Sequence, residues 1–178
     1  AVVGGLDVVD ADIVGIALRS GESQDQMMML VVEKGSPETV HSEAVRLTAW
    51  DVDAIARNPE SVTLSADPGV SGVLAALPAA EGLKVTALPV MLDKRLEAIL
   101  CIGRSDGREF TDEERVQARQ LADQVAVALS NSKLIDELKA LTWGTLEAFA
   151  RAIDAKSPWT AGHSERVTTM SLRIAAKM

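Results

Sequence analysis

The fold is decided by two neighbouring stretches, KVTALPVMLDKRLEAILCIGR over residues 84–104 and FTDEERVQARQLADQVAVALSN over residues 110–131. The first predicts two strands, Lys84–Leu92 and Arg95–Arg104, which are joined by a tight turn at Asp93–Lys94. Both faces of the first strand are apolar, which is typical of a central strand that is covered on both sides. The second stretch begins with the pattern of a helix N-terminus. We therefore expect a hairpin within a sheet, followed by a helix.

The residues before this hairpin predict the remainder of the sheet. Three segments have the apolar or alternating pattern of strands: Asp10–Arg19, Met27–Glu33 and Ser61–Ala66. A helix is predicted from Thr48, where Asp51 completes a capping box, to Asn58. A shorter helix is predicted from Pro68 to Leu77. The predicted order is β-β-α-β-α-β-β-α, an α+β fold with a mainly antiparallel sheet.

Composition narrows the partners and the compartment. The chain has 178 residues, a net charge of −8 and a single cysteine, Cys101. The negative charge, without any run of Lys or Arg, argues against nucleic acids and anionic membranes as partners. One cysteine cannot form an intrachain disulfide, no apolar run is long enough to cross a bilayer, and nothing reads as a signal peptide. We therefore expect a cytoplasmic protein.

The helix that begins at Thr111 is unusually long. Its pattern continues past Gly144 to Lys156, so it would span about 70 Å, roughly twice the width of a compact domain of this size. One series of residues follows the 4-3-4-3 spacing of a coiled-coil seam: Val127, Asn131, Leu134, Leu138 and Leu141. Packing on the chain's own sheet can account for residues up to Leu129. For the rest we expect a parallel homodimer through this helix.

The second half of the sheet and the long helix resemble a GAF domain. The residues that carry the resemblance are Ala87–Val90, Asp93–Lys94, Leu96–Leu100, Glu109–Glu113 and Leu121–Asn131. The resemblance implies a six-stranded antiparallel sheet flanked by helices, with a long C-terminal signalling helix and a helical extension. It also implies a module that senses a small molecule or dimerises, and it leaves the ligand unidentified.

The segment after the long helix resembles the start of an HD-GYP phosphohydrolase domain, from the bacterial family that degrades cyclic di-GMP. The resemblance lies in LEAFARAID over residues 146–154 and SPWTAGHSERV over residues 157–167. It implies that His163 is a metal-site residue, for iron or manganese, in the complete parent domain. The His-Asp pair and the Gly-Tyr-Pro motif of that family come further along the chain. We therefore expect no catalytic residue and no cofactor in these 178 residues alone.

Four residues are candidates for a chemical role, and each also has a purely structural interpretation. Trp50 and His41 lie in the segment that is near the ligand cavity in GAF folds, so both are candidates for a pocket wall. The alternatives are core packing for Trp50 and an exposed surface position for His41. Without further ligands, His163 is expected to be a solvated loop residue, because a lone imidazole binds metal weakly. Cys101 is expected to be a buried, unreactive thiol.

Together these features divide the chain into a GAF domain (1–130), a connecting and dimerising helix (131–157) and the truncated start of an HD-GYP domain (158–178). The expected function is regulatory: a GAF sensor of unknown input, in bacterial signal transduction, that controls a metal-dependent cyclic di-GMP phosphodiesterase. The alternative is a GAF module without a ligand that dimerises and positions the output domain. A GAF-type methionine sulfoxide reductase is disfavoured, because it would need catalytic cysteines and only Cys101 is present.

Overall fold

The computed structural model describes residues 9–21, 23, 25–58, 60–64, 71–78, 83–156 and 162–177, with the backbone alone at 37–39. The chain forms two compact units, Ala1–Ser130 and Asn131–Met178. Three predicted features fall partly or wholly outside the described residues. They are the end of the strand predicted at 61–66, the start of the helix predicted at Pro68, and the Ser157–Ala161 part of the HD-GYP-like segment.

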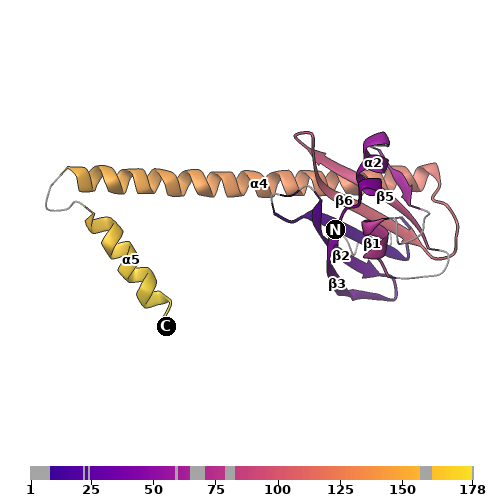
Figure 1. Cartoon of the computed structure of the whole chain (residues 1–178), viewed down its shortest axis with the longest axis horizontal. Coiled ribbons are helices and arrows are strands. Elements are labelled where there is room, and N and C mark those ends of the chain that lie inside the picture. The colour runs from indigo at the N-terminus through magenta and orange to yellow at the C-terminus, as the bar shows by residue number, and fades with distance from the viewer. Residues whose placement is uncertain are drawn as a thin grey trace. The chain divides into compact units, whose positions relative to one another are not determined.

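The sheet is antiparallel throughout and has the strand order β3-β2-β1-β6-β5-β4 (Figure 1). The strands are β1 (Ile13–Arg19), β2 (Gln26–Glu33), β3 (Ser36–Arg46), β4 (Val62–Leu64), β5 (Lys84–Leu92) and β6 (Arg95–Arg104). The predicted β5–β6 turn is confirmed: Asp93 and Lys94 both have positive φ angles, of 50° and 64°, as a two-residue hairpin turn requires. The predicted α+β class and six-stranded sheet are also confirmed.

β3 is the strand that the pattern of residues failed to predict. The predicted order had five strands, with none between Glu33 and Thr48. The sequence of β3, SPETVHSEAVR, is mostly polar, because β3 lies at the sheet edge with β2 as its single neighbour. Only Lys34 and Gly35 separate these two strands. β2 therefore forms a hairpin with β3 in addition to its pairing with β1.

Two apolar cores lie on opposite faces of the sheet. One packs beneath α2 (Ala49–Arg57) and α3 (Gly72–Ala75). The other packs against α4 (Asp112–Ala155), through Ala118, Ala122 and Val125. Successive side chains of a strand point to opposite faces, so β5 and β6 supply both cores. This explains why β5 is apolar on both faces.

Local sequence signals set the helix ends. Thr48 caps α2 and Asp51 completes the capping box, as predicted. The predicted box at the start of α4 is confirmed as well: the Thr111 N–H donates to the Glu114 carboxylate, and the Glu114 N–H donates to the Thr111 hydroxyl. α4 then continues for 44 residues, and α5 (His163–Ala175) follows it. Within the described residues, no helix has both the length and the hydropathy that crossing a bilayer requires.

Candidate functional site

A pocket of about 410 Å³ opens between the β2–β3 hairpin and the end of α3. Its lining residues are Val31, Glu33, His41, Ser42, Glu43, Ala76, Leu77 and Pro78. Val31 and Leu77 are buried and make part of the lining apolar, whereas His41 and Glu43 are exposed at its edge. The volume is within the range of small-molecule sites.

Two carboxylates give this pocket a negative charge. Glu33 and Glu43 belong to neighbouring strands, and neither makes an ion pair with another described residue. The field of two carboxylates that no described cation neutralises favours cations and hydrogen-bond donors over anions.

The two residues that the sequence proposed for a pocket have different positions. His41 is an exposed residue that lines the pocket. Trp50 is half-buried in the first turn of α2, where it packs against the core, and it is not among the lining residues. Sequence reasoning missed Glu43, although alternation of His41, Glu43 and Val45 would have placed all three on one face of a recognised β3.

A buried carboxylate joins α2 to α3, whose end forms one wall of the pocket. Asp51 is 2% exposed. It accepts hydrogen bonds from the Thr48 N–H (2.8 Å) and hydroxyl (3.0 Å), from the Ser71 hydroxyl (2.5 Å) and from the Gly72 N–H (2.9 Å). Position 72 requires glycine, because a Cβ there would lie 2.0 Å from the carbonyl oxygen of Arg46. The start of α3 is therefore fixed by one side chain and one close backbone approach.

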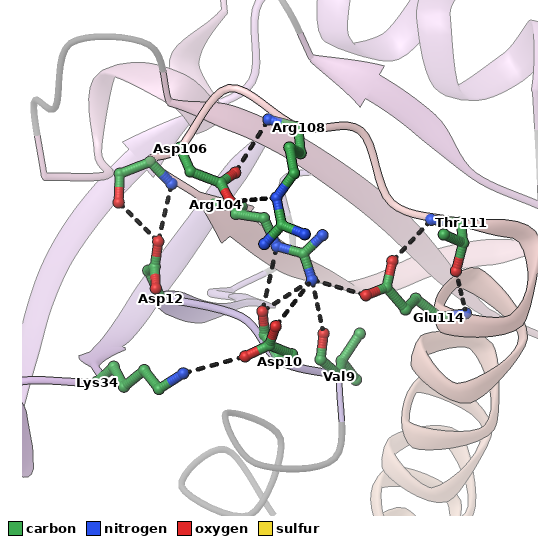
Figure 2. Close-up of polar contacts among 10 residues, drawn as sticks. Val9, Asp10, Asp12, Lys34, Arg104, Asp106, Arg108, Thr111 and Glu114 are labelled. Atoms are coloured by element: carbon green, nitrogen blue, oxygen red, sulfur yellow. Dashed lines mark hydrogen bonds and ion pairs between the residues drawn. The ribbon is translucent and has the colours of Figure 1, made fainter.

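A second polar cluster lies where the segment before β1, the end of β6 and the start of α4 meet (Figure 2). The Arg104 side chain at its centre is 4% exposed. Its guanidinium donates to the Asp10 carbonyl oxygen (2.9 and 3.2 Å) and to the Glu114 carboxylate (2.7 Å). It also lies over the Phe110 ring, 4.5 Å from the centroid, a cation–π contact. One buried cation thus holds three segments of the chain.

Hydrogen bonds lower the pKa values of two carboxylates in this cluster, Glu114 and Asp12. The hydrogen bond from Arg104, with that from the Thr111 N–H, lowers the pKa of Glu114 to about 2, and Glu114 in turn raises the pKa of Arg104. Hydrogen bonds from the Ser105 hydroxyl and N–H lower the pKa of Asp12. At neutral pH, Glu114 is therefore the ionised partner of Arg104, and Asp12 is an ionised acceptor for Ser105.

Cys101 takes no part in either polar cluster. It is buried in the core beneath α2 and α3. Desolvation raises the pKa of its thiol to about 12, so the nucleophilic thiolate is scarce at neutral pH. The predicted buried, unreactive thiol agrees with this environment.

In the second unit, the corner between α4 and α5 is fixed by a carboxylate. Asp154 is 8% exposed and accepts hydrogen bonds from the Ser164 N–H (3.1 Å) and hydroxyl (3.0 Å). It satisfies an N–H of the first turn of α5, which the N-cap residue Gly162 cannot do because it has no side chain. His163, the first residue of α5, is exposed. Among the described residues, no group of three His, Cys, Asp or Glu side chains could hold a metal ion, so the metal role of His163 remains a prediction.

The later part of α4 carries an exposed apolar face. The predicted seam residues Val127, Leu134, Leu138 and Leu141 are between 59% and 68% exposed, and Asn131 is exposed too. Leu146, Phe149 and Ile153, later in α4, are also exposed, but they do not continue the seam, whose spacing would next reach positions 145, 148 and 152. An apolar row of this length is typical of an interaction surface.

Comparisons with known proteins identify the fold of the first unit. The GAF domain of an Acinetobacter phosphoenolpyruvate-protein phosphotransferase matches with a TM-score of 0.56 and 17% identity, over 75% of this chain and 80% of that one. The GAF-B domain of DevS from Mycobacterium smegmatis matches with a TM-score of 0.53 and 19% identity, over 77% and 93%. No curated protein matches the sequence. The profile of the GAF domain matches residues 5–129, and the chain therefore belongs to the GAF family of regulatory sensor domains.

Proposed function

We propose that this chain is the regulatory region of a bacterial signalling protein, in which the GAF domain binds a small molecule and controls an HD-GYP cyclic di-GMP phosphodiesterase. The observation that supports this most is α4. One uninterrupted helix packs its first turns on the GAF sheet, and its last turns contain the first part of the HD-GYP-like segment, residues 146–154. A rigid helix carries a displacement at one end to the other.

The pocket supports the sensing half of this proposal. Its size suits a metabolite, and its apolar residues lie beside the carboxylates of Glu33 and Glu43. A ligand with an apolar part and an ammonium group would bury its apolar part against the apolar lining residues, and its ammonium group would pair with the two carboxylates. We therefore expect small amines to bind better than carboxylic or phosphorylated metabolites.

A thermal-shift panel tests this expectation. Spermidine, agmatine and choline represent cationic ligands, and citrate and glucose 6-phosphate represent anionic ones. At least one amine is expected to raise the melting temperature, and Glu43→Gln is expected to weaken the effect. Glu60→Gln, which removes an exposed carboxylate outside the pocket lining, is the control. If no compound binds, the alternative of a GAF module that only dimerises and positions its output is favoured.

The exposed face of α4 supports a second copy of the chain as its partner. In a parallel, in-register pair of α4 helices, each seam residue from Val127 to Leu141 faces the same residue of the second copy. The Asn131 amide then pairs with the other Asn131 amide, which is the least costly arrangement for a buried polar residue in the seam. Burying each of Leu134, Leu138 and Leu141 contributes about 1.5–3 kcal/mol. Six leucines in a dimer then contribute about 9–18 kcal/mol, which is comparable with or larger than the cost of association, about 4–15 kcal/mol.

Sedimentation tests this pairing. The native chain is expected to be a dimer at tens of micromolar, and the double variant Leu134→Glu with Leu138→Glu a folded monomer, because four carboxylates would meet in the seam. The control variant, Ser132→Glu with Ala140→Glu, adds the same charge at exposed positions outside the heptad seam and should remain a dimer. A native monomer with α4 intact would contradict the proposed seam.

Hydrolysis of cyclic di-GMP tests the proposed output. The 178-residue chain with Mn²⁺ should give no linear product, because the described residues do not form a metal site. The natural protein that carries this region should hydrolyse cyclic di-GMP, and His163→Ala should abolish the activity. Thr169→Ala, at an exposed position of α5 that follows the HD-GYP-like segment, is the control and should leave the activity unchanged. If the natural protein is inactive, or if His163→Ala retains full activity, the proposed output is wrong.

A further inference from the structure

The pocket hairpin and the start of α4 are attached to the same short segment, Val9–Asp12. This segment precedes β1 and lies within the cluster of Figure 2. Everything that connects the pocket to α4 through it belongs to the first compact unit. A series of contacts through Val9–Asp12 therefore joins the proposed sensor pocket to the start of α4.

The first link joins the pocket to the segment. Glu33 lines the pocket, and the next residue, Lys34, is in the β2–β3 turn. The Lys34 N–H donates to the Asp12 carbonyl oxygen (2.8 Å), and its ammonium donates to the Asp10 carboxylate (3.1 Å). The pairing of β2 with β3 shifts register between Val31 and Glu33, so the hairpin is irregular where it borders the pocket. A displacement of the hairpin would therefore pull directly on Asp10 and Asp12.

The second link joins the segment to the helix. Arg104 donates to the Asp10 carbonyl oxygen and to the Glu114 carboxylate, and Glu114 belongs to the capping box that begins α4. Arg104 makes a longer hydrogen bond, of 3.5 Å, to the Val9 carbonyl oxygen. The same guanidinium nitrogen, Nη2, donates to both oxygens, so its position depends on both Asp10 and Glu114. A movement of Asp10 is thus passed to the first turn of α4.

The backbone at the shared residue is strained. Asp10 has a φ angle of 45°, in the left-handed region, where a non-glycine residue persists only if its surroundings hold it. The hydrogen bonds from Arg104 to its carbonyl oxygen and from Lys34 to its carboxylate are contacts that hold it. Strain of this kind is released when the holding contacts shift.

We propose that Arg104 is the positioning residue that couples the pocket to α4, through Lys34 and the strained Asp10. The proposal rests on the proposed sensor function and specifies its regulation. Filling the pocket displaces the β2–β3 hairpin, loosens the hold on Asp10, and changes the position of the guanidinium that holds Glu114. The first turns of α4 then become less firmly attached to the sheet.

Amide hydrogen exchange on the intact chain measures this coupling without a known ligand. Ala76→Trp places an indole in the pocket from a half-buried lining position. Ala56→Trp introduces the same side chain at an exposed position of α2 outside the lining and serves as the control. The reporter is the set of amides at 116–122 in α4, which are past the first turn and so have partners within the helix.

Ala76→Trp is expected to accelerate exchange at 116–122 at least threefold, and Ala56→Trp to leave it unchanged. In an Arg104→Met background the reporter amides should already exchange faster, and Ala76→Trp should add less than 1.5-fold. Arg104→Lys, which keeps the charge but lacks the planar fork, provides a second background if the methionine variant does not fold.

Two outcomes would overturn the proposal. One is no acceleration by Ala76→Trp in the native background, and the other is an equal acceleration in both backgrounds. Neither outcome bears on amine binding or on the His163→Ala assay. Conversely, a failed ligand panel would leave the exchange result intact, so the coupling and the sensor function can fail independently.

Discussion

Removing the Asp51 carboxylate should destabilise the GAF domain far more than removing its neighbour Asp53. In Asp51→Ala the Ser71 hydroxyl and the Gly72 N–H lose their buried acceptor. Each buried donor that is left without a partner costs about 1–3 kcal/mol. Loss of the α2 capping box, in which Thr48 takes part, costs about 1 kcal/mol more. The expected loss is therefore about 3–7 kcal/mol, a large share of the 5–15 kcal/mol that stabilises a typical domain.

Urea denaturation followed by far-UV circular dichroism measures this loss. The protein concentration must be the same for all variants, because association would make the midpoint depend on concentration. Asp53→Ala is the matched control: it lies two residues away in α2 and makes an exposed i,i+4 ion pair with Arg57, worth about 0.3–0.5 kcal/mol. Asp51→Asn, which keeps the shape and one acceptor oxygen, should fall between them. If Asp51→Ala loses less than about 1 kcal/mol, the carboxylate does not hold α2 and α3 together.

Three further predictions follow from the surroundings of single residues. Gly72→Ala should lower the free energy of unfolding by at least about 2 kcal/mol in the same urea assay, as expected for overpacking. Gly144→Ala, whose Cβ would meet nothing within 4 Å, should raise it by about 0.5–1 kcal/mol; equal effects would contradict the close approach at Gly72. The pKa of Glu114 is lowered to about 2, so its stabilising contribution is present above its unfolded pKa and is lost as pH falls from about 4.3 towards 2. Glu114→Gln should flatten that part of the stability–pH curve, and an unchanged curve would show that the ion pair is not formed. Cys101 should react with a thiol reagent at pH 8 only as fast as the protein unfolds, and rapid labelling of the folded protein would refute its burial.

Sequence patterns predicted the elements whose position depends on residues that are close together in the chain. The capping residues Thr48 and Thr111 mark the starts of α2 and α4, and the Asp93–Lys94 turn was identified with the strands on either side. Each of these depends on residues that are within four positions of one another. β3 was missed for the opposite reason, because an edge strand with one partner needs few apolar residues and leaves a weak pattern.

The candidate site could be predicted much less completely. The capping pattern predicts the role of Asp51 at the start of α2. It does not predict the hydrogen bonds of Asp51 with Ser71 and Gly72, which are 20 and 21 residues away, because contacts at that separation produce no periodic pattern in the sequence. In the sequence, Arg104 has the pattern of a polar residue that ends an apolar strand. Its partner at position 10 is 94 residues away, so only the folded sheet brings them together.

The polar sequence of β3 also protects the protein from misassembly. An edge strand presents unpaired N–H and C=O groups that can recruit a strand of another molecule. Along β3, the exposed His41, Ser42 and Glu43 place hydrophilic and charged groups where an intruding strand would have to lie. Replacing them with valine would make the strand easy to recognise from sequence. It would also turn the sheet edge into a nucleus for aggregation.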